Sequence, residues 1–258
     1  MQTNKLSVVI PTIQKNTELL IKLLSTLNED ASVDEIILID NSLKGIDYSN
    51  PKLRIITPKE NLYVNPSWNL GVKEAKNDYV ALLNDDIIIS NNFCSQIVSN
   101  MTPEMGCVGM NSSEYVSTTD VIQDNLDNNK IELKHEKYMD LFWGIAIFFH
   151  KNAYNEIPEE LKIIHGDTWI FEQAKKQGKK NYFINNQLVY HFGSLSHGDK
   201  SFNPVCINDK KIFDKMFYPW YRKLFSIEGR LNGIRVWLFG LKLIFSFRKR
   251  KNLVEKAQ

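Results

Sequence analysis

Three short polar segments, each placed directly after an apolar run, carry the side chains of this chain that could do chemistry. They are Pro11-Thr12, Asp40-Asn41 and Asn84-Asp85-Asp86. The acidic side chains of the third segment are typical ligands of a hard divalent cation such as Mg²⁺ or Mn²⁺, which prefers oxygen atoms and bound phosphates. A polar turn that ends a strand uses the same residue types, so the pattern leaves both interpretations open.

Asp40 has two interpretations as well. An acidic residue at the end of a second strand accepts hydrogen bonds from a ribose or a base in nucleotide-binding sheets. The run Asp40-Asn41-Ser42 is also typical of a turn in which the aspartate binds its own backbone. No GxGxxG follows the first apolar run and no GxxxxGK[ST] occurs in the chain, so no dinucleotide loop or P-loop is predicted. Phosphates would therefore be held through a metal ion.

The elements that must position these segments alternate between strands and helices over the first hundred residues. Compact apolar runs predict strands, and apolar residues at helical spacing predict helices. The predicted strands are Leu6–Ile10, Glu35–Ile39, Leu53–Ile56 and Tyr79–Leu83, and the predicted helices are Thr17–Leu27 and Pro66–Ala75. This alternation favours an open, Rossmann-like α/β sheet in which the carboxyl ends of the strands share one edge. We therefore expect the three polar segments to converge on one crevice.

The second half of the chain has a different pattern. Residues 111–130 are rich in Asn, Asp, Ser and Thr and predict a loop, and the mixed segments that follow predict an α+β half. We expect one domain over residues 1–200, composed of halves 1–100 and 101–200, and a C-terminal extension over residues 201–258.

Composition limits the function classes. The chain has 258 residues, 43% of them hydrophobic and 24% charged, which is ordinary globular composition and excludes a disordered protein. A formal net charge of +2 is too balanced for a protein whose whole surface binds nucleic acid. The cysteines Cys94, Cys107 and Cys206 form no CxxC pair, so no disulfide framework or structural zinc site is predicted. The N-terminus shows no signal-peptide pattern. We expect a cytoplasmic protein.

The end of the chain predicts an amphipathic helix over Ser226–Phe247. Its charged residues fall seven apart on an otherwise apolar segment, at Glu228, Arg235, Lys242 and Lys249. Because Arg235 and Lys242 interrupt the apolar runs, these fall short of the roughly 20 residues that a spanning helix needs. The basic run Arg248–Lys251 would attract anionic lipid headgroups, so the helix could lie on the inner face of the cell membrane. Packing on its own domain or on a second subunit of an oligomer is equally compatible with the pattern.

Together these motifs resemble the GT-A-fold glycosyltransferases of family 2, in particular the bacterial branch that includes rhamnosyl- and galactosyltransferases of surface polysaccharides. The resemblance covers about residues 5–198. The matching segments, in chain order, are Val8–Thr12, Leu38–Ser42, Glu60–Leu62, Trp68–Gly71, Leu82–Ile87, Gly144, His165–Trp169 and Val189–Ser194. Each motif is weak alone, but their order and spacing are specific.

The resemblance implies an inverting, hexosyltransferase-type enzyme that moves a sugar from a nucleotide diphosphate sugar to an acceptor hydroxyl. It implies a nucleotide-sugar half over residues 1–100 and an acceptor half over residues 101–200. Mg²⁺ or Mn²⁺ would neutralise the charge on the leaving diphosphate. Asp86 matches the last metal-binding aspartate of the family's Asp-x-Asp motif. Asn84 replaces the first, and Asp85 could serve instead.

Two further residues acquire roles from the resemblance. Asp167 matches the family's catalytic aspartate, which as general base takes the proton of the acceptor hydroxyl, and Glu172 is a more distant alternative for this role. An N-cap of the predicted helix Thr168–Lys176 is a compatible structural role. His191 matches a histidine that contacts the metal or the diphosphate, although a histidine beside a strand is often only a packing residue.

The remaining matches have weaker expectations. Asn61 and Asn69 match a loop that lies close to the nucleotide sugar, and they could also be ordinary cap and turn residues. Trp143, Gly144 and Trp169 could shape an acceptor pocket, because aromatic faces suit the apolar faces of sugar rings, or they could belong to the core.

The sequence therefore predicts a metal-dependent glycosyltransferase with a nucleotide diphosphate sugar as donor and a glycan or lipid-linked acceptor. Nucleic acid is not expected as a partner. Two alternatives remain. Family acids are missing at Asn84, Gly166 and Trp169, which would suit a catalytically inactive sugar-nucleotide-binding module. A nucleotidyltransferase would use a similar sheet, but no glycine- and Arg/Lys-rich triphosphate loop follows the first predicted strand.

Overall fold

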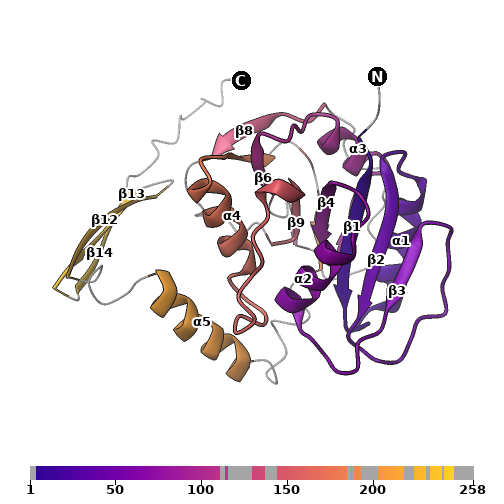
Figure 1. Cartoon of the computed structure of the whole chain (residues 1–258), viewed down its shortest axis with the longest axis horizontal. Helices are drawn as coiled ribbons and strands as arrows, with labels where there is room; N and C mark the ends of the chain where they lie inside the picture. The colour runs from indigo at the N-terminus through magenta and orange to yellow at the C-terminus, as the bar shows by residue number, and fades with distance from the viewer. Residues whose placement is uncertain are drawn as a thin grey trace, which may run out of the picture.

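The fold is known from a computed structural model. It describes residues 4–110, 114–115, 130–136, 144–184, 187, 189–192, 203–217, 224–230, 233–239 and 241–246. Figure 1 shows a central sheet with helices on both sides and a small separate sheet near the C-terminus.

The central sheet has eight strands and is mostly parallel, as the sequence predicts. Its order is β3 (Leu53–Ile56), β2 (Val33–Asp40), β1 (Leu6–Thr12), β4 (Tyr79–Leu83), β9 (Ala146–His150), β6 (Met105–Met110), β10 (Lys180–Ile184) and β8 (Leu133–Glu136). Only β9 and β8 run against their neighbours. The carboxyl ends of β1, β2 and β4 therefore lie along one edge.

Helices cover both faces of this sheet. One hydrophobic core contains side chains of α1 (Thr17–Glu29) and α3 (Phe93–Val98). A second core contains side chains of α2 (Val64–Glu74), α4 (Gly166–Lys176) and α5 (Asn203–Phe217). A single turn of 3₁₀ helix, Lys151–Ala153, follows β9. The result is a three-layer α/β/α arrangement, and because both faces of the sheet are covered at its centre, β1 and β4 have nearly continuous apolar sequences.

Local sequence explains the main elements. In β1, Val8 and Ile10 belong to one core and Val9 to the other. Asn16 caps α1 by accepting a hydrogen bond from the Leu19 N–H at 3.0 Å. On α2, an ideal Cβ added to Gly71 would lie 2.1 Å from Val9 Cγ1. The glycine in the Trp68–Gly71 motif is therefore needed for the close packing of α2 on β1.

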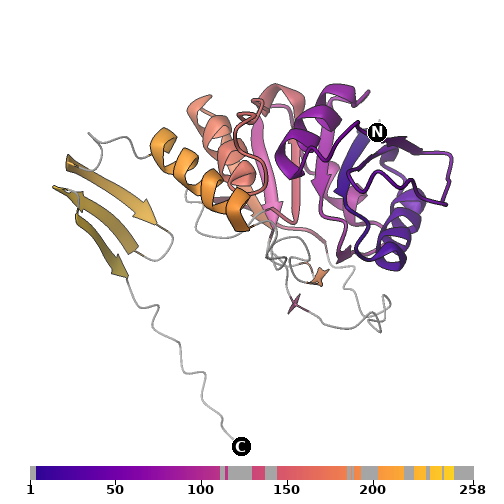
Figure 2. The same cartoon turned by 90° about the horizontal axis from the view of Figure 1, so that it is seen from below.

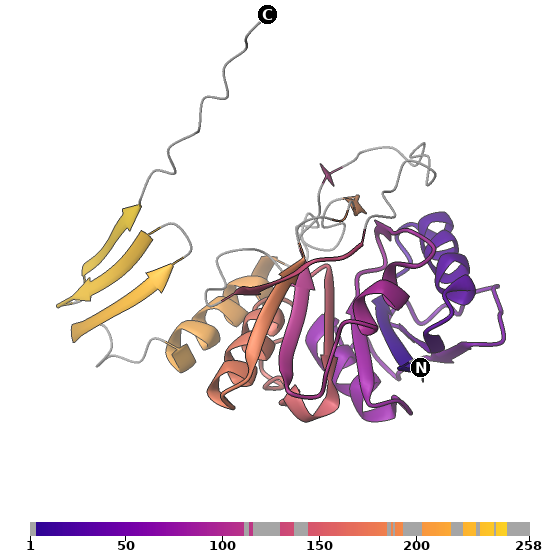
Figure 3. The same cartoon turned by 90° about the horizontal axis from the view of Figure 1, so that it is seen from above.

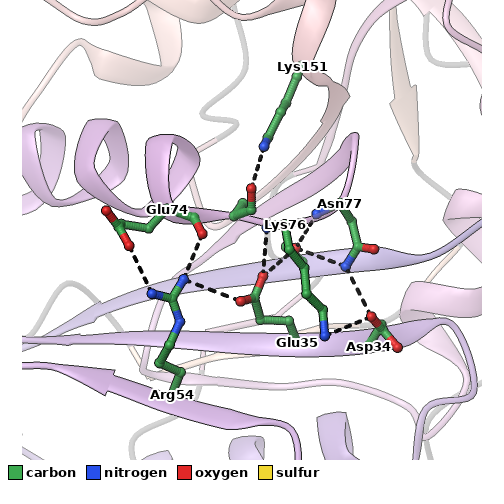
Figure 4. Close-up of polar contacts among 9 residues, drawn as sticks. Asp34, Glu35, Arg54, Glu74, Lys76, Asn77 and Lys151 are labelled. Carbon is green, nitrogen blue, oxygen red and sulfur yellow. Dashed lines mark hydrogen bonds and ion pairs between the residues drawn. The ribbon is translucent and has the colours of Figure 1, made fainter.

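A polar cluster around Glu35 lies at the opposite edge of the sheet, where β1 and β2 begin, and connects the elements that meet there (Figure 4). Glu35 accepts hydrogen bonds from the Ser7 hydroxyl at 2.7 Å and from the Lys76 N–H at 3.0 Å. Arg54 lies 3.3 Å from Glu35 and 2.9 Å from Glu74. These contacts fix the end of α2 to the first three strands, so we assign this cluster to stability.

A small three-stranded sheet extends the edge where β4 ends. It consists of β5 (Ile87–Ile88), β11 (Tyr190–His191) and β7 (Glu114–Tyr115) in that order. β11 is antiparallel to β5, with His191 opposite Ile87. The predicted loop over residues 111–130 lies outside the described residues except for β7 and Lys130.

The predicted amphipathic helix over 226–247 is wrong, because this segment forms three antiparallel strands. They are β12 (Phe225–Arg230), β13 (Gly233–Leu238) and β14 (Leu241–Ser246). Pairing of Arg230 with Gly233 and of Leu238 with Leu241 leaves two residues in each turn. In the sequence, Asn232-Gly233 at the first connection and Gly240 in the second are hairpin signals. Apolar residues recur at every second position of each strand, with Trp237 and Ile244 in addition to this pattern. The period of two, and not the seven-residue spacing of the charges, decides the structure.

Helix α5 lies within the predicted C-terminal extension, but it packs against the domain that precedes it. Phe213 of α5 is buried in the same core as side chains of α2 and α4. The division at residue 200 stays a prediction. Within the described part of the chain, no helix is both long enough and apolar enough to cross a bilayer.

Candidate active site

The ends of β1, β2 and β4 bring the three polar segments together. Thr12 pairs in register with Asp40, and Pro11 with Ile39. The Asn41 N–H donates to the Thr12 carbonyl at 2.8 Å. The Thr12 hydroxyl donates to Asp85 Oδ2 at 2.5 Å. The structure therefore confirms the prediction that the three strand ends converge.

Asp85 and Asp86 differ in their surroundings. Asp85 is partly exposed, but its carboxyl group binds the buried Thr12 side chain. Burial of that carboxyl group and the neighbouring charge of Asp86 raise the pKa of Asp85 to about 7, although the bond from Thr12 acts in the other direction. Asp86 is 4% exposed and points toward His191.

Asp86 and His191, the predicted metal ligands, face each other. His191 Nε2 lies 3.1 Å from Asp86 Oδ1, and both side chains are buried. The pairing of β11 with β5 explains this geometry, since the Phe192 N–H also donates to the Asp86 carbonyl at 3.0 Å. A histidine that is far away in the sequence is thereby held beside the end of β4.

The chemistry of this pair fits a divalent cation. Asp86 Oδ1 is buried and accepts no hydrogen bond within the described residues. A carboxylate oxygen and an imidazole nitrogen are both ligands of Mn²⁺, and Mg²⁺ is usually held by one or two carboxylates together with substrate phosphates. No cluster of three His, Cys, Asp or Glu side chains suited to a metal occurs in the described part of the chain. The pair could therefore supply two of the roughly six ligands of such an ion.

Asp167 lies in the first turn of α4, near the edge of the sheet at which β4 ends. The helix begins at Gly166, so the predicted N-cap role of Asp167 is wrong. An ideal Cβ added to Gly144 would lie 3.4 Å from Asp167 Oδ2, which places the carboxylate against Gly144. The next residue, Ile145, accepts a hydrogen bond from the Asn84 N–H at 3.0 Å. Gly144 and Ile145 thus connect the predicted base to the predicted metal segment.

The loop that precedes Asp167 is held in place by α5. Asp209, which is fully buried, accepts hydrogen bonds from three consecutive N–H groups, those of Lys162, Ile163 and Ile164, at 2.6–3.1 Å. His165 follows in the left-handed conformation with φ 66°. Its ring stacks on Phe213, with centroids 4.1 Å apart and planes at 13°. Burial lowers the pKa of His165.

Asp209 and Phe213 were not among the predicted site residues. They are four residues apart and so lie on one face of α5. The only signal in the sequence is an aspartate on the apolar side of an amphipathic helix, which gives no information about its partners.

The missing acid at position 166 has a steric explanation. An ideal Cβ on Gly166 would lie 2.1 Å from Asn65 Oδ1 and 3.1 Å from Trp68 Cζ3. Asn65 is fully buried and donates to the Ile164 carbonyl at 3.2 Å. Asn65 therefore occupies the space that a side chain at position 166 would need.

Asp40 binds its own loop. Its carboxylate is fully buried and accepts hydrogen bonds from the Ser42 hydroxyl at 2.6 Å and the Gly45 N–H at 2.9 Å. Burial alone would raise the pKa of Asp40, but these bonds and one from Gln14 hold it below its ordinary value. The structure therefore confirms the turn interpretation of Asp40, and a contact of Asp40 with a nucleoside stays a prediction.

Asn41 and Asn61 fix the loop between β3 and α2. Asn41 accepts from the Leu62 N–H at 2.9 Å and donates to the Ser67 hydroxyl at 2.9 Å. Asn61 accepts from the Tyr63 N–H at 2.7 Å. This loop lies beside the end of β2, so both residues are near the predicted nucleotide site in a supporting position.

Asn69 is placed elsewhere. Its amide donates to the Ile157 carbonyl at 2.8 Å and accepts from the Tyr154 hydroxyl at 2.6 Å. These partners follow β9, which is antiparallel to β4 and therefore ends at the opposite edge of the sheet. The structure does not bring Asn69 to the strand ends, and its role is to hold residues 154–157 against α2.

The predicted acceptor residues separate. Gly144 lies against Asp167. Trp169 donates from Nε1 to the Glu156 carbonyl at 3.0 Å and packs edge-on against Phe217 of α5, with centroids 5.9 Å apart. Two residues correspond to about 200° around a helix, so Trp169 and Asp167 point in different directions. Trp169 is therefore a packing residue, and Trp143 lies outside the described residues.

A mostly parallel α/β sheet with two reversed strands, and with acidic side chains gathered at its carboxyl edge, defines the GT-A class of fold. The model of one protein family, described as glycosyl transferase family 2, matches residues 7–175. The chain belongs to this family. No curated protein sequence matches the chain.

Solved structures with a similar fold include two glycosyltransferase-type proteins. GalNAc-T7, solved with UDP, GalNAc and Mn²⁺, superposes with a TM-score of 0.64 at 14% identity over 85% of this chain and 49% of its own. TarS residues 1–349 from S. aureus, solved with UDP, gives a TM-score of 0.53 at 14% identity over 72% of this chain and 60% of its own. The chain thus spans about half to three fifths of these proteins, and at this identity the likeness concerns the fold.

Proposed function

We propose that the protein is an inverting glycosyltransferase. It would move a sugar from a nucleotide diphosphate sugar to a hydroxyl of a glycan or lipid-linked acceptor, in bacterial surface polysaccharide synthesis. Family membership supports the class of reaction. The observation that carries the proposal is the connection through Gly144 and Ile145, which joins Asp167 to the strand end that bears Asp86.

Asp86 and His191 would hold the divalent cation, Mn²⁺ or Mg²⁺. The ion, when bound, stabilises the negative charge of the leaving diphosphate. The structure of GalNAc-T7 with UDP and Mn²⁺ supports a nucleotide donor and a metal in this fold. Thr12, Asp85 and Asn84 border the same strand ends and would line the donor site.

Asp167 would accept the proton of the attacking hydroxyl. One of its oxygens, Oδ1, accepts from the Thr168 N–H at 2.7 Å, and the other, Oδ2, is the atom closest to Gly144. The positive end of α4 favours the charged carboxylate in this first turn. Attack by the hydroxyl on the anomeric carbon, opposite the departing diphosphate, gives inversion in a single displacement.

The test is an Asp167→Asn variant. We expect nucleoside diphosphate release in the presence of acceptor to fall by about 10²–10⁴-fold, because the amide cannot act as a base. Donor binding, measured by thermal shift, should be retained. The matched control is Glu172→Gln, which removes a carboxylate from the same helix one turn further on. An Asp167→Asn protein that transfers sugar at the parent rate would show that another group is the base.

A non-catalytic sugar-nucleotide-binding module is the second candidate. It is favoured by Asn84 at the position of the first motif acid and by the pair of metal-type ligands where three would be expected. This candidate predicts donor binding by the parent protein without release of nucleoside diphosphate for any acceptor. The parent activity in the same assay therefore separates the two.

A further inference from the structure

The sheet formed by β12, β13 and β14, called the C-terminal meander below, has one face composed of apolar residues. In an antiparallel sheet, directly paired residues point to the same face and their neighbours in the strand to the other. The pairs Phe225–Leu238 and Ile227–Val236 continue across β13 to Leu241 and Leu243. The apolar face consists of Phe225, Ile227, Ile234, Val236, Leu238, Leu241, Leu243 and Phe245, with Gly229 at its edge.

This face is open to solvent. Leu241 is 66% exposed, Phe225 65%, Ile227 62% and Phe245 50%. Figures 2 and 3 show the meander, in yellow, beyond α5 and at the other end of the molecule from α1. Contiguous apolar surface of this kind marks a site of interaction with a protein or a membrane.

The opposite face is more polar. It carries Arg235 and Lys242 together with Trp237 and Ile244, and the Lys242 ammonium lies 5.8 Å from the centre of the Trp237 ring. The two faces of the meander therefore differ in polarity. Of the charged residues that the sequence places seven apart, Arg235 and Lys242 share a face, on strands in place of a helix, and Glu228 pairs with Arg235 in register. Lys249 lies outside the described residues.

Charge in this chain is strongly segregated. Residues 222–251 contain nine basic residues and one acidic residue, a net charge of +8. Because the whole chain carries +2, the remaining residues carry −6. The run Arg248–Lys251 follows β14 almost directly. The segment with the exposed apolar face is thus also the segment with the concentrated positive charge.

We propose that the C-terminal meander docks on a bilayer that contains anionic phospholipids. The apolar face enters the interfacial region, and the basic residues that flank it in the sequence bind the phosphate groups of the lipids. A peripheral attachment of this kind needs no spanning helix.

Charge distinguishes the bilayer from a second copy of the chain. Two meanders packed face to face would bring together two segments of +8 each, which repel one another. An anionic surface instead attracts the segment and repels the rest of the chain, which orients the protein. A nucleic acid would satisfy the charge but not the apolar face.

This docking concerns a surface outside the proposed active site, and its test does not depend on turnover. Full-length protein is mixed with vesicles of phosphatidylcholine, or of phosphatidylcholine with phosphatidylglycerol, and sedimented. We expect binding to the anionic vesicles that is at least about ten-fold tighter than to the neutral ones, and that weakens as salt is added.

Two variants and one control separate the contributions of the surface. The double variant Ile227→Ser/Leu241→Ser removes two exposed apolar side chains, and replacing residues 248–251 by serine removes four charges. Each should weaken binding to anionic vesicles by about ten-fold or more. Ile207→Ser is the matched control, because Ile207 of α5 is 57% exposed but lies outside the meander. Circular dichroism and donor-induced thermal shift check that each variant is folded.

Three results would overturn the proposal. The first is no binding of the parent to either vesicle. The second is unchanged binding by both variants. The third is a dimer in analytical ultracentrifugation that Ile227→Ser/Leu241→Ser converts to a monomer, which would assign the apolar face to a second copy. None of these results bears on Asp167, so failure here is distinguishable from failure of the proposed function.

Discussion

At the scale of single residues, contacts of the backbone decide which side chains can occupy the candidate site. Gly166 stands where the family resemblance implies an acid, and the space for a Cβ is taken by Asn65. Gly144, in contrast, has room for a Cβ in ordinary contact with Asp167. A glycine is therefore needed at position 166 because no space is left for a side chain. At position 144 the glycine instead leaves the approach to the Asp167 carboxylate open.

Gly166→Ala should destabilise the folded protein by about 1–3 kcal/mol, because the added methyl group overlaps Asn65 Oδ1. Urea unfolding measures this loss. Much of it should disappear in an Asn65→Ala background, where the overlapping atom is gone. Gly144→Ala is the stability control and should change the free energy of unfolding by far less. Equal losses for the two glycines would show that the contact with Asn65 is not the cause.

His165 should make stability depend on pH. Burial lowers its pKa, so below about 6.5 the unfolded chain binds a proton that the folded chain does not. Its contribution to stability is therefore complete above that pH and is lost as the pH falls through this range. The variant His165→Asn, which tolerates the left-handed backbone, should be less stable at neutral pH but show a shallower decline of melting temperature below pH 6.5. Parallel curves for parent and variant would contradict this assignment.

At the scale of elements, α5 supports the loop that carries the predicted base. The family model ends at residue 175, but Asp209 and Phe213 of α5 contact residues 162–165 directly. A carboxylate has two acceptor oxygens with about four lone-pair positions, so one aspartate side chain can accept hydrogen bonds from all three N–H groups. This helix is therefore part of the candidate site, although it lies beyond the matched region.

Asp209→Asn should lower kcat by on the order of ten- to hundred-fold with little change in the KM for the donor, because the loop loses its fixed position. The amide presents N–H groups toward the N–H groups of residues 162–164, which are repulsive contacts. Steady-state kinetics with donor and acceptor varied separately measure the split. Asp214→Asn, which removes the same charge from α5, is the control. A change in donor KM alone would argue against a positioning role for Asp209.

Much of this element structure could be predicted from the sequence. The run Tyr79–Leu83 coincides with β4, because a strand buried on both faces has an uninterrupted apolar sequence. The run Leu53–Ile56 coincides with β3, which is a partly exposed edge strand. The C-terminal strands were missed because each is only six residues long, and short apolar runs fit a helix as well as a strand. Asp209 could not be found, since its partners are 45–47 residues away and only the packing of α5 brings them together.

The candidate site was predicted in part. Asp86 and His191 are adjacent as the family resemblance implies, because β11 pairs with β5. Asn69 and Trp169 match family motifs, but the structure uses them to hold residues 154–157 and α5. A motif records that a residue type is needed, and it does not distinguish a ligand contact from a packing contact.

At the scale of the whole molecule, the candidate active site and the proposed docking surface occupy different parts of the chain. The carboxyl edge of the large sheet gathers the candidate donor and base residues, while the polar cluster around Glu35 joins the opposite edge (Figure 4). The C-terminal meander carries the exposed apolar face, and the segment 222–251 that contains it has a net charge of +8. If the meander lies on a bilayer, a lipid-linked acceptor would already be concentrated at that surface.

The central claim is that Asp86 and His191 bind a metal and the diphosphate of a donor, with Asp167 beside them as base. The most direct test is a thermal-shift measurement with a panel of nucleotide diphosphate sugars, each with and without Mn²⁺. A ligand that binds only the folded protein raises its melting temperature. We predict that one donor does so only when Mn²⁺ is present, that Asp86→Asn and His191→Ala lose this increase, and that Asp167→Asn keeps it. An increase of the same size in Asp86→Asn and His191→Ala would contradict the claim.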